Sequence, residues 1–226
     1  GTFSAGADAI DAFYNGTTDS EYVNYYFTFP SKHLARGVEL MSKLVREPDL
    51  GKSALETERK VVQGELERHA SEPDFLLLTE NDLMLWGDDG YLIKNPAGNI
   101  LALTAATPQR LQELYKKFYV PNNAALVIAG DVSDTTAFAL AATTFKNWKK
   151  GDDPFATLKP GGIAPLTGIK RKVFSAEVND VTFMVSWHGP SVQKQAAPTY
   201  AADVFSGLVN QRISGTQKRL VDAGLF

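Results

Sequence analysis

The sequence predicts an α+β fold in which helices are layered on a mostly antiparallel sheet. The main observation is the order of elements that residue patterning indicates: strands, helices, a strand, a helix, two strands and two helices. A second observation is length, because 226 residues can bury a core of ordinary size without disulfides. A third is composition, since hydrophobic residues make up 44% of a chain that contains no cysteine. This is typical of a globular protein and excludes thiolate metal sites and cysteine nucleophiles.

Two strands open the pattern. Residues 12–14 indicate the first, and an alternation typical of one buried face indicates a second strand over 23–29. The turn between them has two candidate positions, at 15–16 (Asn-Gly, the favoured type I′ dipeptide) or at 19–21 (Asp-Ser-Glu). Local turn chemistry alone favours 15–16.

Three helices are predicted next. The first begins at Ser31, a candidate cap. The second begins at a capping box over 53–56, with serine at the cap and glutamate three residues later, and runs to about Ala70. The third spans 75–86 and is followed by a loop over 87–99, which is rich in Gly, Asp, Asn and Pro.

The rest of the chain alternates helices and strands. Thr107 and Pro108 open a helix, with the proline at its first position, and the apolar run 124–129 indicates a buried strand. Residues 150–168, rich in glycine and proline, are expected to link two structural halves of a single domain over 1–226. We expect both ends of that domain to be cut. The remaining predicted elements are a helix over 134–145, strands over 170–176 and 181–187, and helices over 198–212 and 216–223.

Charge and hydropathy exclude several functional classes. The 23 basic and 26 acidic residues give a net charge of −3, which argues against an electrostatic nucleic-acid binder. No apolar run approaches the ~18 residues that a transmembrane helix needs. The first residues lack the basic and apolar regions of a signal peptide. The compartment stays open, because a chain without cysteine suits the bacterial cytoplasm and periplasm equally.

The predicted helix over 53–70 carries the strongest functional signal. On a helical wheel its charged residues cluster on one face, except that Glu58 and Glu65 fall within the apolar stripe. They are seven residues apart, or about 10 Å along the axis. Burying carboxylates is costly unless they are paired or bind a metal, so two on one stripe suggest a site. The alternatives are buried ion pairs with Arg or Lys of neighbouring elements, or a hydrated edge of the stripe.

His69 lies one turn after Glu65, and such a pair can ligate a metal when a third ligand is near. A surface or capping role is the alternative for this histidine. The chain has no phosphate-binding glycine loop, no serine nucleophile elbow and neither orientation of the zinc motif His-Glu-x-x-His. The sequence therefore offers a candidate carboxylate site and no complete catalytic motif.

Segments along almost the whole chain resemble the pitrilysin/insulinase family of zinc metallopeptidases, which includes the mitochondrial processing peptidases. Each segment is short, but they occur in the family's order. The matching segments are Asn15-Gly16-Thr17-Thr18 with Tyr25-Tyr26-Phe27, the helical stretch 58–65, Phe118 to Asn123 with 129–132, His188 to Ser191, and 219–225.

The resemblance implies the processing-peptidase type of metallohydrolase fold and an amino-terminal half of a zinc endopeptidase. In the family, two homologous halves or subunits close around a peptide substrate. Glu65 would then be a zinc ligand, and Glu58 the nearby acidic residue that supports the catalytic site without holding the metal. Asn15, Gly16, Thr17 and Thr18 would lie along the cleft and pair with an extended peptide through backbone groups. That role moves the expected hairpin turn to 19–21.

One departure from the family limits this prediction. The family's His-x-x-Glu-His helix supplies two zinc ligands and the base, and it should lie before the first strand, where this chain begins too late to contain it. Because a catalytic zinc needs three protein ligands, we expect the fragment alone to bind no zinc and cleave nothing. Two alternatives remain: a non-catalytic family member acting as a peptide-binding or scaffold subunit, and an unrelated α+β domain. Retention of Glu58 and Glu65 favours the enzyme.

Overall fold

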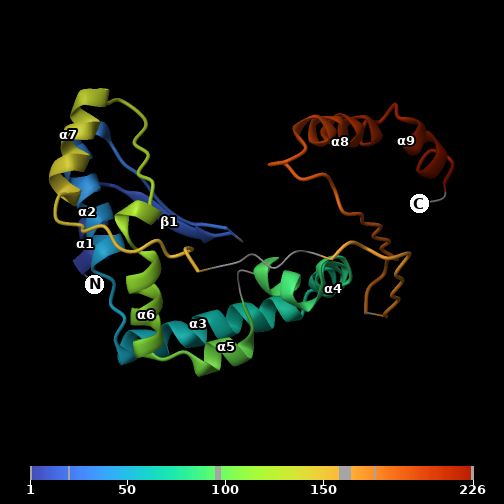
Figure 1. Cartoon of the computed structure of the whole chain (residues 1–226), viewed down its shortest axis with the longest axis horizontal. Coiled ribbons are helices and arrows are strands. Elements are labelled where there is room, and N and C mark those ends of the chain that lie inside the picture. The colour runs from blue at the N-terminus through green and yellow to red at the C-terminus, as the bar shows by residue number, and fades with distance from the viewer. Residues whose placement is uncertain (1, 20, 95–97, 158–163, 176, 225–226) are drawn as a thin grey trace.

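The computed structural model describes residues 2–19, 21–94, 98–157, 164–175 and 177–224. Figure 1 shows a hairpin with α1, α2 and α7 at one end of the molecule, α3 to α6 below and beside it, and α8 and α9 at the other end. The fold is α+β, as predicted, with helices dominating a small antiparallel sheet.

The hairpin pairs β1 (Phe13–Thr18) with β2 (Val23–Thr28) in antiparallel register. The backbone N–H of Asp19 donates to the carbonyl of Tyr22 at 2.9 Å, which places the turn after β1. The turn over 15–16 that local chemistry favours is therefore wrong, because those two residues lie inside β1. The later turn implied by the family resemblance is confirmed.

Two helices cover one face of the hairpin. In α1 (Thr2–Asp8), which the sequence did not predict, the ring of Phe3 packs against Tyr14 and Phe27 of the hairpin at centroid distances of 5.3 and 5.7 Å. A 3-10 turn, η1 (Ser31–His33), leads into α2 (Leu34–Arg46). The hydrophobic core between these two helices and the hairpin includes the buried residues Ala7, Ile10, Val38 and Leu40.

The expected cap at Ser31 is wrong. His33 occupies the N-cap position of α2 without a side-chain bond, and the hydroxyl of Ser31 instead donates to Asp131, 100 residues away, at 3.0 Å. Asp131 precedes α7 (Asp134–Phe145), the predicted helix, whose cap is Ser133. Since α7 packs against α2, the serine helps to join the start of one helix to the approach to the other.

The lower layer begins with α3 (Lys52–Ala70), which packs against α4 (Pro73–Lys94) and α5 (Ile100–Ala105). Gly51 is the N-cap of α3, so the predicted capping box at Ser53 does not form. Helix α4 extends past the predicted end at residue 86, with a break at Gly87, whose φ of 69° glycine tolerates. The loop predicted over 87–99 is therefore wrong for 88–94, and residues 95–97 lie outside the described part.

Helix α6 (Pro108–Phe118) is confirmed with its predicted cap, because the side chain of Thr107 accepts from the N–H of Arg110. A 3-10 turn, η2 (Pro121–Asn123), follows it. Helices α8 (Ala196–Val209) and α9 (Gly215–Leu220) correspond to the last two predicted helices, although both end earlier than expected. None of the described helices is long and apolar enough to cross a membrane.

Among the described residues, the three later predicted strands are not formed. In the described residues, 124–129, 170–175 and 181–187 have no strand partner, and most of their apolar side chains are exposed, as Val127 (84%) and Val181 (80%) illustrate. An apolar run becomes a strand only when a neighbouring strand bonds its backbone. The position 176 lies outside the described residues.

Candidate functional site

Strand β1 has a free edge. The hydrogen bond between Asp19 and Tyr22 marks a bonded pair, and bonded and non-bonded pairs alternate along an antiparallel ladder. The backbone groups of Tyr14, Gly16 and Thr18 therefore point away from β2. Within the described residues β1 has no second strand neighbour, and all four residues from 15 to 18 are exposed. The predicted peptide-binding residues thus lie on an open strand edge.

One outward-facing donor is occupied by a side chain. The N–H of Gly16 donates to Oδ1 of Asn15 at 2.7 Å. The side-chain amide oxygen of Asn15 is chemically similar to a peptide carbonyl. It therefore accepts the hydrogen bond of the Gly16 N–H that the carbonyl of a neighbouring strand would otherwise accept. An incoming peptide can exchange with this bond because both groups are exposed to solvent.

A hollow of about 250 Å³ adjoins this edge. It lies on the face that α1 and α2 cover, because Tyr14 and Gly16 pair with Phe27 and Tyr25, whose rings belong to that face. Among the described residues, no charged side chain lines it. Its lining residues, which define what we call the edge hollow, are Phe3, Tyr14, Asn15, Gly16, Tyr25 and Leu44.

Tyr25, which lines the edge hollow, is paired with a second tyrosine, Tyr119. The hydroxyls of Tyr25 and Tyr119 share a hydrogen bond of 2.7 Å between β2 and the end of α6. Burial, reinforced by this bond, raises the pKa of Tyr119 well above the ordinary tyrosine value. Burial also raises the pKa of Tyr115, whose hydroxyl donates to the carbonyl of Val45 at 2.9 Å. Sequence reasoning missed this pair, although the matching segment 118–123 contains Tyr119.

Helix α3 presents Glu58 and Glu65 to solvent. Both residues are exposed, and among the described residues neither carboxylate has an ion pair or hydrogen bond. The prediction that they turn inward is therefore wrong, and so is the alternative of buried ion pairs. The covered face of α3 is centred about 60° from Glu58 around the helix axis. The buried or half-buried residues of α3 are Ala54, Leu55, Arg59, Val62, Leu66 and His69, and all but Ala54 lie on this face.

Arg59 explains why the covered face of α3 is turned away from Glu58 and Glu65. The wheel places it on the charged side, yet its side chain is only 19% exposed. Its guanidinium donates to the carbonyls of Leu103, Thr104 and Ala106, with the last two bonds at 2.8 Å. These carbonyls lie at the end of α5, where the helix leaves few backbone donors for them, although that of Leu103 also accepts from the N–H of Ala106 at 3.3 Å. The arginine thus fastens α5 against α3 and turns the two glutamates outward.

His69 has a surface role, in agreement with the alternative stated for it. Its Nδ1 lies 3.7 Å from a carboxylate oxygen of Glu72, and its ring is 5.9 Å from that of Phe75. In the described part of the chain, no three His, Asp or Glu side chains are close enough to hold a metal ion. The residues present therefore do not fit a complete zinc centre, which needs three protein ligands.

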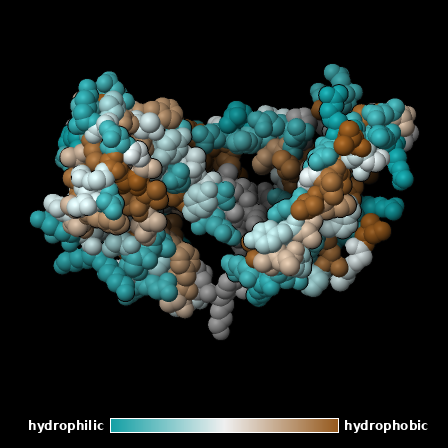
Figure 2. Space-filling view, turned by 90° about the horizontal axis from the view of Figure 1, so that it is seen from above, coloured by the Kyte–Doolittle hydropathy of each residue, from teal (hydrophilic) through white to brown (hydrophobic). Residues whose placement is uncertain are grey.

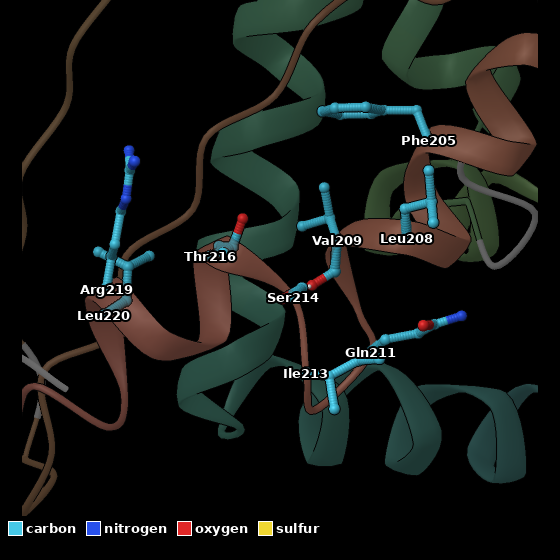
Figure 3. Close-up of a pocket in the computed structure, with 10 residues that line it drawn as sticks. Phe205, Leu208, Val209, Gln211, Ile213, Ser214, Thr216, Arg219 and Leu220 are labelled. Carbon is cyan, nitrogen blue, oxygen red and sulfur yellow. Dashed lines mark hydrogen bonds between the residues drawn. The ribbon is translucent and has the colours of Figure 1, made fainter.

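A second hollow, of about 740 Å³, lies between α8 and α9. Figure 3 shows Phe205, Leu208 and Val209 on one side of it and Arg219 at the far end. Figure 2 shows apolar surface at this end of the molecule as well as at the end that carries the hairpin. Its lining is mainly apolar, with Gln211, Ser214 and Thr216 as polar members and Arg219 as the one charged member among the described residues, so it offers no paired acid and base.

Comparisons with known proteins match both halves of the chain. A family model described as insulinase (peptidase family M16) matches residues 2–84, and one described as the peptidase M16 inactive domain matches residues 105–222. The beta subunit of the mitochondrial-processing peptidase of Blastocladiella emersonii is 26% identical over 148 residues, which cover 65% of this chain and 31% of that protein.

Solved structures share the fold. An M16-like peptidase from Alicyclobacillus acidocaldarius gives a TM-score of 0.60 at 22% identity, covering 66% of this chain and 35% of that one. A protease from Helicobacter pylori gives 0.59 at 21% identity, covering 72% and 38%. The chain spans about a third of the length of these relatives. Since one family model alone matches more than half of its residues, the chain belongs to the insulinase family of peptidases, peptidase family M16.

Proposed function

We propose that this chain is the part of a zinc endopeptidase that holds the peptide substrate, and that it contributes one ligand to a zinc centre completed by other residues. The observation that carries the proposal is the open edge of β1, where residues 15–18 are exposed and two of them, Asn15 and Gly16, line the edge hollow. Family membership makes a peptide the appropriate ligand for such an edge. The pairing mode is β-augmentation, in which backbone hydrogen bonds supply much of the affinity.

Peptide pairing engages the outward backbone groups of β1. An extended peptide beside this edge would bond to Tyr14, Gly16 and Thr18, and the side chain of Asn15 would release the N–H of Gly16. Because backbone groups are common to all peptides, this edge gives binding with little dependence on sequence. Selectivity must come from neighbouring side chains.

Glu65 is the proposed zinc ligand, and Glu58 the supporting acid. Their exposure and their lack of partners among the described residues leave both free to face a segment that carries the remaining ligands. The chain alone should bind no zinc, and calorimetric titration with zinc chloride tests this. Sub-micromolar binding that Glu65→Gln abolishes would contradict it. In the complete enzyme, Glu65→Gln should lower the zinc content and Glu58→Gln should leave it intact, with Glu67→Gln as an exposed control on the same helix.

The peptide proposal is tested by scanning a bound peptide with N-methyl groups. Methylation removes one N–H donor at a time. Pairing along β1 should therefore weaken binding at every second peptide position and spare the positions between. Fluorescence polarisation with labelled peptides measures this. The variant Gly16→Pro, which lacks the outward N–H, should bind all peptides more weakly, whereas Glu58→Gln should not change the affinity. A uniform effect of methylation would contradict edge pairing.

A non-catalytic subunit is the second candidate. The description of the model that matches residues 105–222 names an inactive domain, and the Blastocladiella relative is itself named as a subunit. In either case we propose a second homologous half as the partner that closes over the peptide. Cleavage of a generic peptide by the complete protein, lost on adding a chelator, would establish the enzyme. Binding without cleavage would establish the scaffold.

A further inference from the structure

We propose that Tyr119 is a positioning residue of the peptide-binding edge. Its hydroxyl holds the ring of Tyr25 in place as a wall of the edge hollow, and thereby sets which peptide side chain the hollow accepts. This inference rests on the function proposed above and deepens it, because it assigns a source of selectivity to an edge whose backbone bonds supply none.

The ring of Tyr25 lies directly beside the outward-facing position of β1. Gly16 and Tyr25 are partners across the hairpin. A Cβ atom added to Gly16 would lie 3.2 Å from Cδ1 of Tyr25, which is a tighter approach than ordinary van der Waals contact. The missing side chain at Gly16 and the position of this ring therefore determine the size of the edge hollow together.

The tyrosine that anchors the ring is itself fixed. Tyr119 lies 94 residues away in the sequence, at the end of α6, and its ring is 5.0 Å from that of Tyr115. Tyr115 is tied in turn to the carbonyl of Val45 in α2. Among the described residues, Tyr119 is the only hydrogen-bond partner of the Tyr25 hydroxyl. This bond therefore helps to fix the orientation of the Tyr25 ring.

A peptide paired with β1 places alternate side chains on each face of the sheet. Those on the face covered by α1 and α2 pass over the edge hollow. Its aromatic and aliphatic lining suits an apolar side chain, and its volume of about 250 Å³ leaves room for one large residue. We therefore expect the edge to favour peptides that carry phenylalanine at that position over peptides that carry alanine.

Selectivity in matched variants tests the inference. The probes are extended, fluorescein-labelled peptides that differ only in having phenylalanine or alanine at the position facing the edge hollow, found by scanning. The full chain should bind the phenylalanine peptide about tenfold or more tightly, as burial of one such side chain implies. Tyr119→Phe should reduce this ratio about two- to tenfold, the range of one lost hydrogen bond, and leave the affinity for the alanine peptide unchanged.

Two further variants keep the test decisive. Tyr25→Phe should reduce the ratio as much as Tyr119→Phe, and the double variant should reduce it no further, because both remove the same bond. If Tyr119→Phe fails to fold, Tyr25→Phe by itself still tests the inference. Tyr26→Phe removes a hydroxyl from the opposite face of β2, away from the edge hollow, and should leave the ratio unchanged. An unchanged ratio in both Tyr25→Phe and Tyr119→Phe would overturn this inference but not the proposed function. Equal binding of the two peptides by the unaltered chain would do the same. Binding of no peptide at all would instead overturn the proposed function.

Discussion

At the scale of single residues, three-dimensional environment outweighs residue type. Glu58 and Glu65 have the wheel position of buried groups, yet both are exposed. Arg59 has the wheel position of a solvated charge, yet it is largely covered and bonds three carbonyls. A guanidinium with several donors can satisfy several orphan carbonyls at once, which no apolar side chain can do. That capacity decides which face of α3 is covered.

We predict that Arg59→Ala lowers the free energy of unfolding by about 1–3 kcal/mol, because it leaves helix-end carbonyls without their charged donor. Arg59→Lys should recover only part of this loss, since a single ammonium cannot match the fork geometry of the guanidinium. Urea denaturation followed by circular dichroism measures both. Arg68→Ala is the control, because its pair with Glu72 is exposed and long at 3.6 Å and should contribute little. Equal losses from both alanine variants would contradict the assignment.

Tyr119 should titrate later than an ordinary tyrosine. Its pKa is raised in the folded chain by burial and by the bond to Tyr25, and returns to about 10 on unfolding. The stability that the protonated hydroxyl contributes is therefore fully present below about pH 10 and is lost as the pH rises toward the folded pKa. Ultraviolet absorbance of tyrosinate should record a late phase that Tyr119→Phe removes. A variant that titrates like the unaltered chain would contradict this.

At the scale of elements, local signals located most helices but not all of their ends. Thr107, Ser133 and Ser214 each accept a hydrogen bond from the backbone at the start of their helices. Ser53 does not, because the N-cap of α3 is Gly51, two residues earlier. Strands were harder to predict, since an apolar run needs a partner from elsewhere in the chain to complete its hydrogen bonds.

The caps give a matched pair of variants. Thr107→Ala should lower the free energy of unfolding by about 0.5–2 kcal/mol, because it removes the acceptor for the N–H of Arg110. Ser53→Ala should change it by less than about 0.5 kcal/mol, since Ser53 lies inside α3 without a capping bond. Chemical denaturation of the two variants measures the difference. A larger loss of stability from Ser53→Ala than from Thr107→Ala would instead support the predicted capping box at Ser53.

At the scale of the whole molecule, residues 170–172 and His188 are held against α4. Lys170 donates to the carbonyl of Met84 at 2.8 Å, and Lys172 pairs with Glu80. Nε2 of His188 bonds the carbonyl of Leu85 at 2.7 Å, while its ring stacks on Trp86 at 4.9 Å. These contacts join residues on both sides of the segment 150–168, which we propose as the linker between two halves of one domain.

His188→Ala should loosen this contact. Loss of one hydrogen bond and one ring stack should raise the open population, and with it the rate of tryptic cleavage at 170–172, about two- to tenfold. His33→Ala is the control, since the imidazole of His33 has no hydrogen bond or ion pair in the described residues. Limited proteolysis followed by mass spectrometry measures the cleavage rate. Equal rates for the two variants would show that the segment is held by other contacts.

Much of this protein could be predicted from residue patterns and family resemblance. Alternation identified the second strand of the hairpin, Thr107 and Pro108 identified the start of α6, and the matching segments identified the family, because each of these signals is local in the sequence. The tertiary structure decided the rest. It set the exposed face of α3 through Arg59, the turn after β1, and the contact between Tyr25 and Tyr119 across 94 residues. These features depend on which distant groups satisfy a hydrogen bond or cover an apolar surface, and local patterning contains no information about that choice.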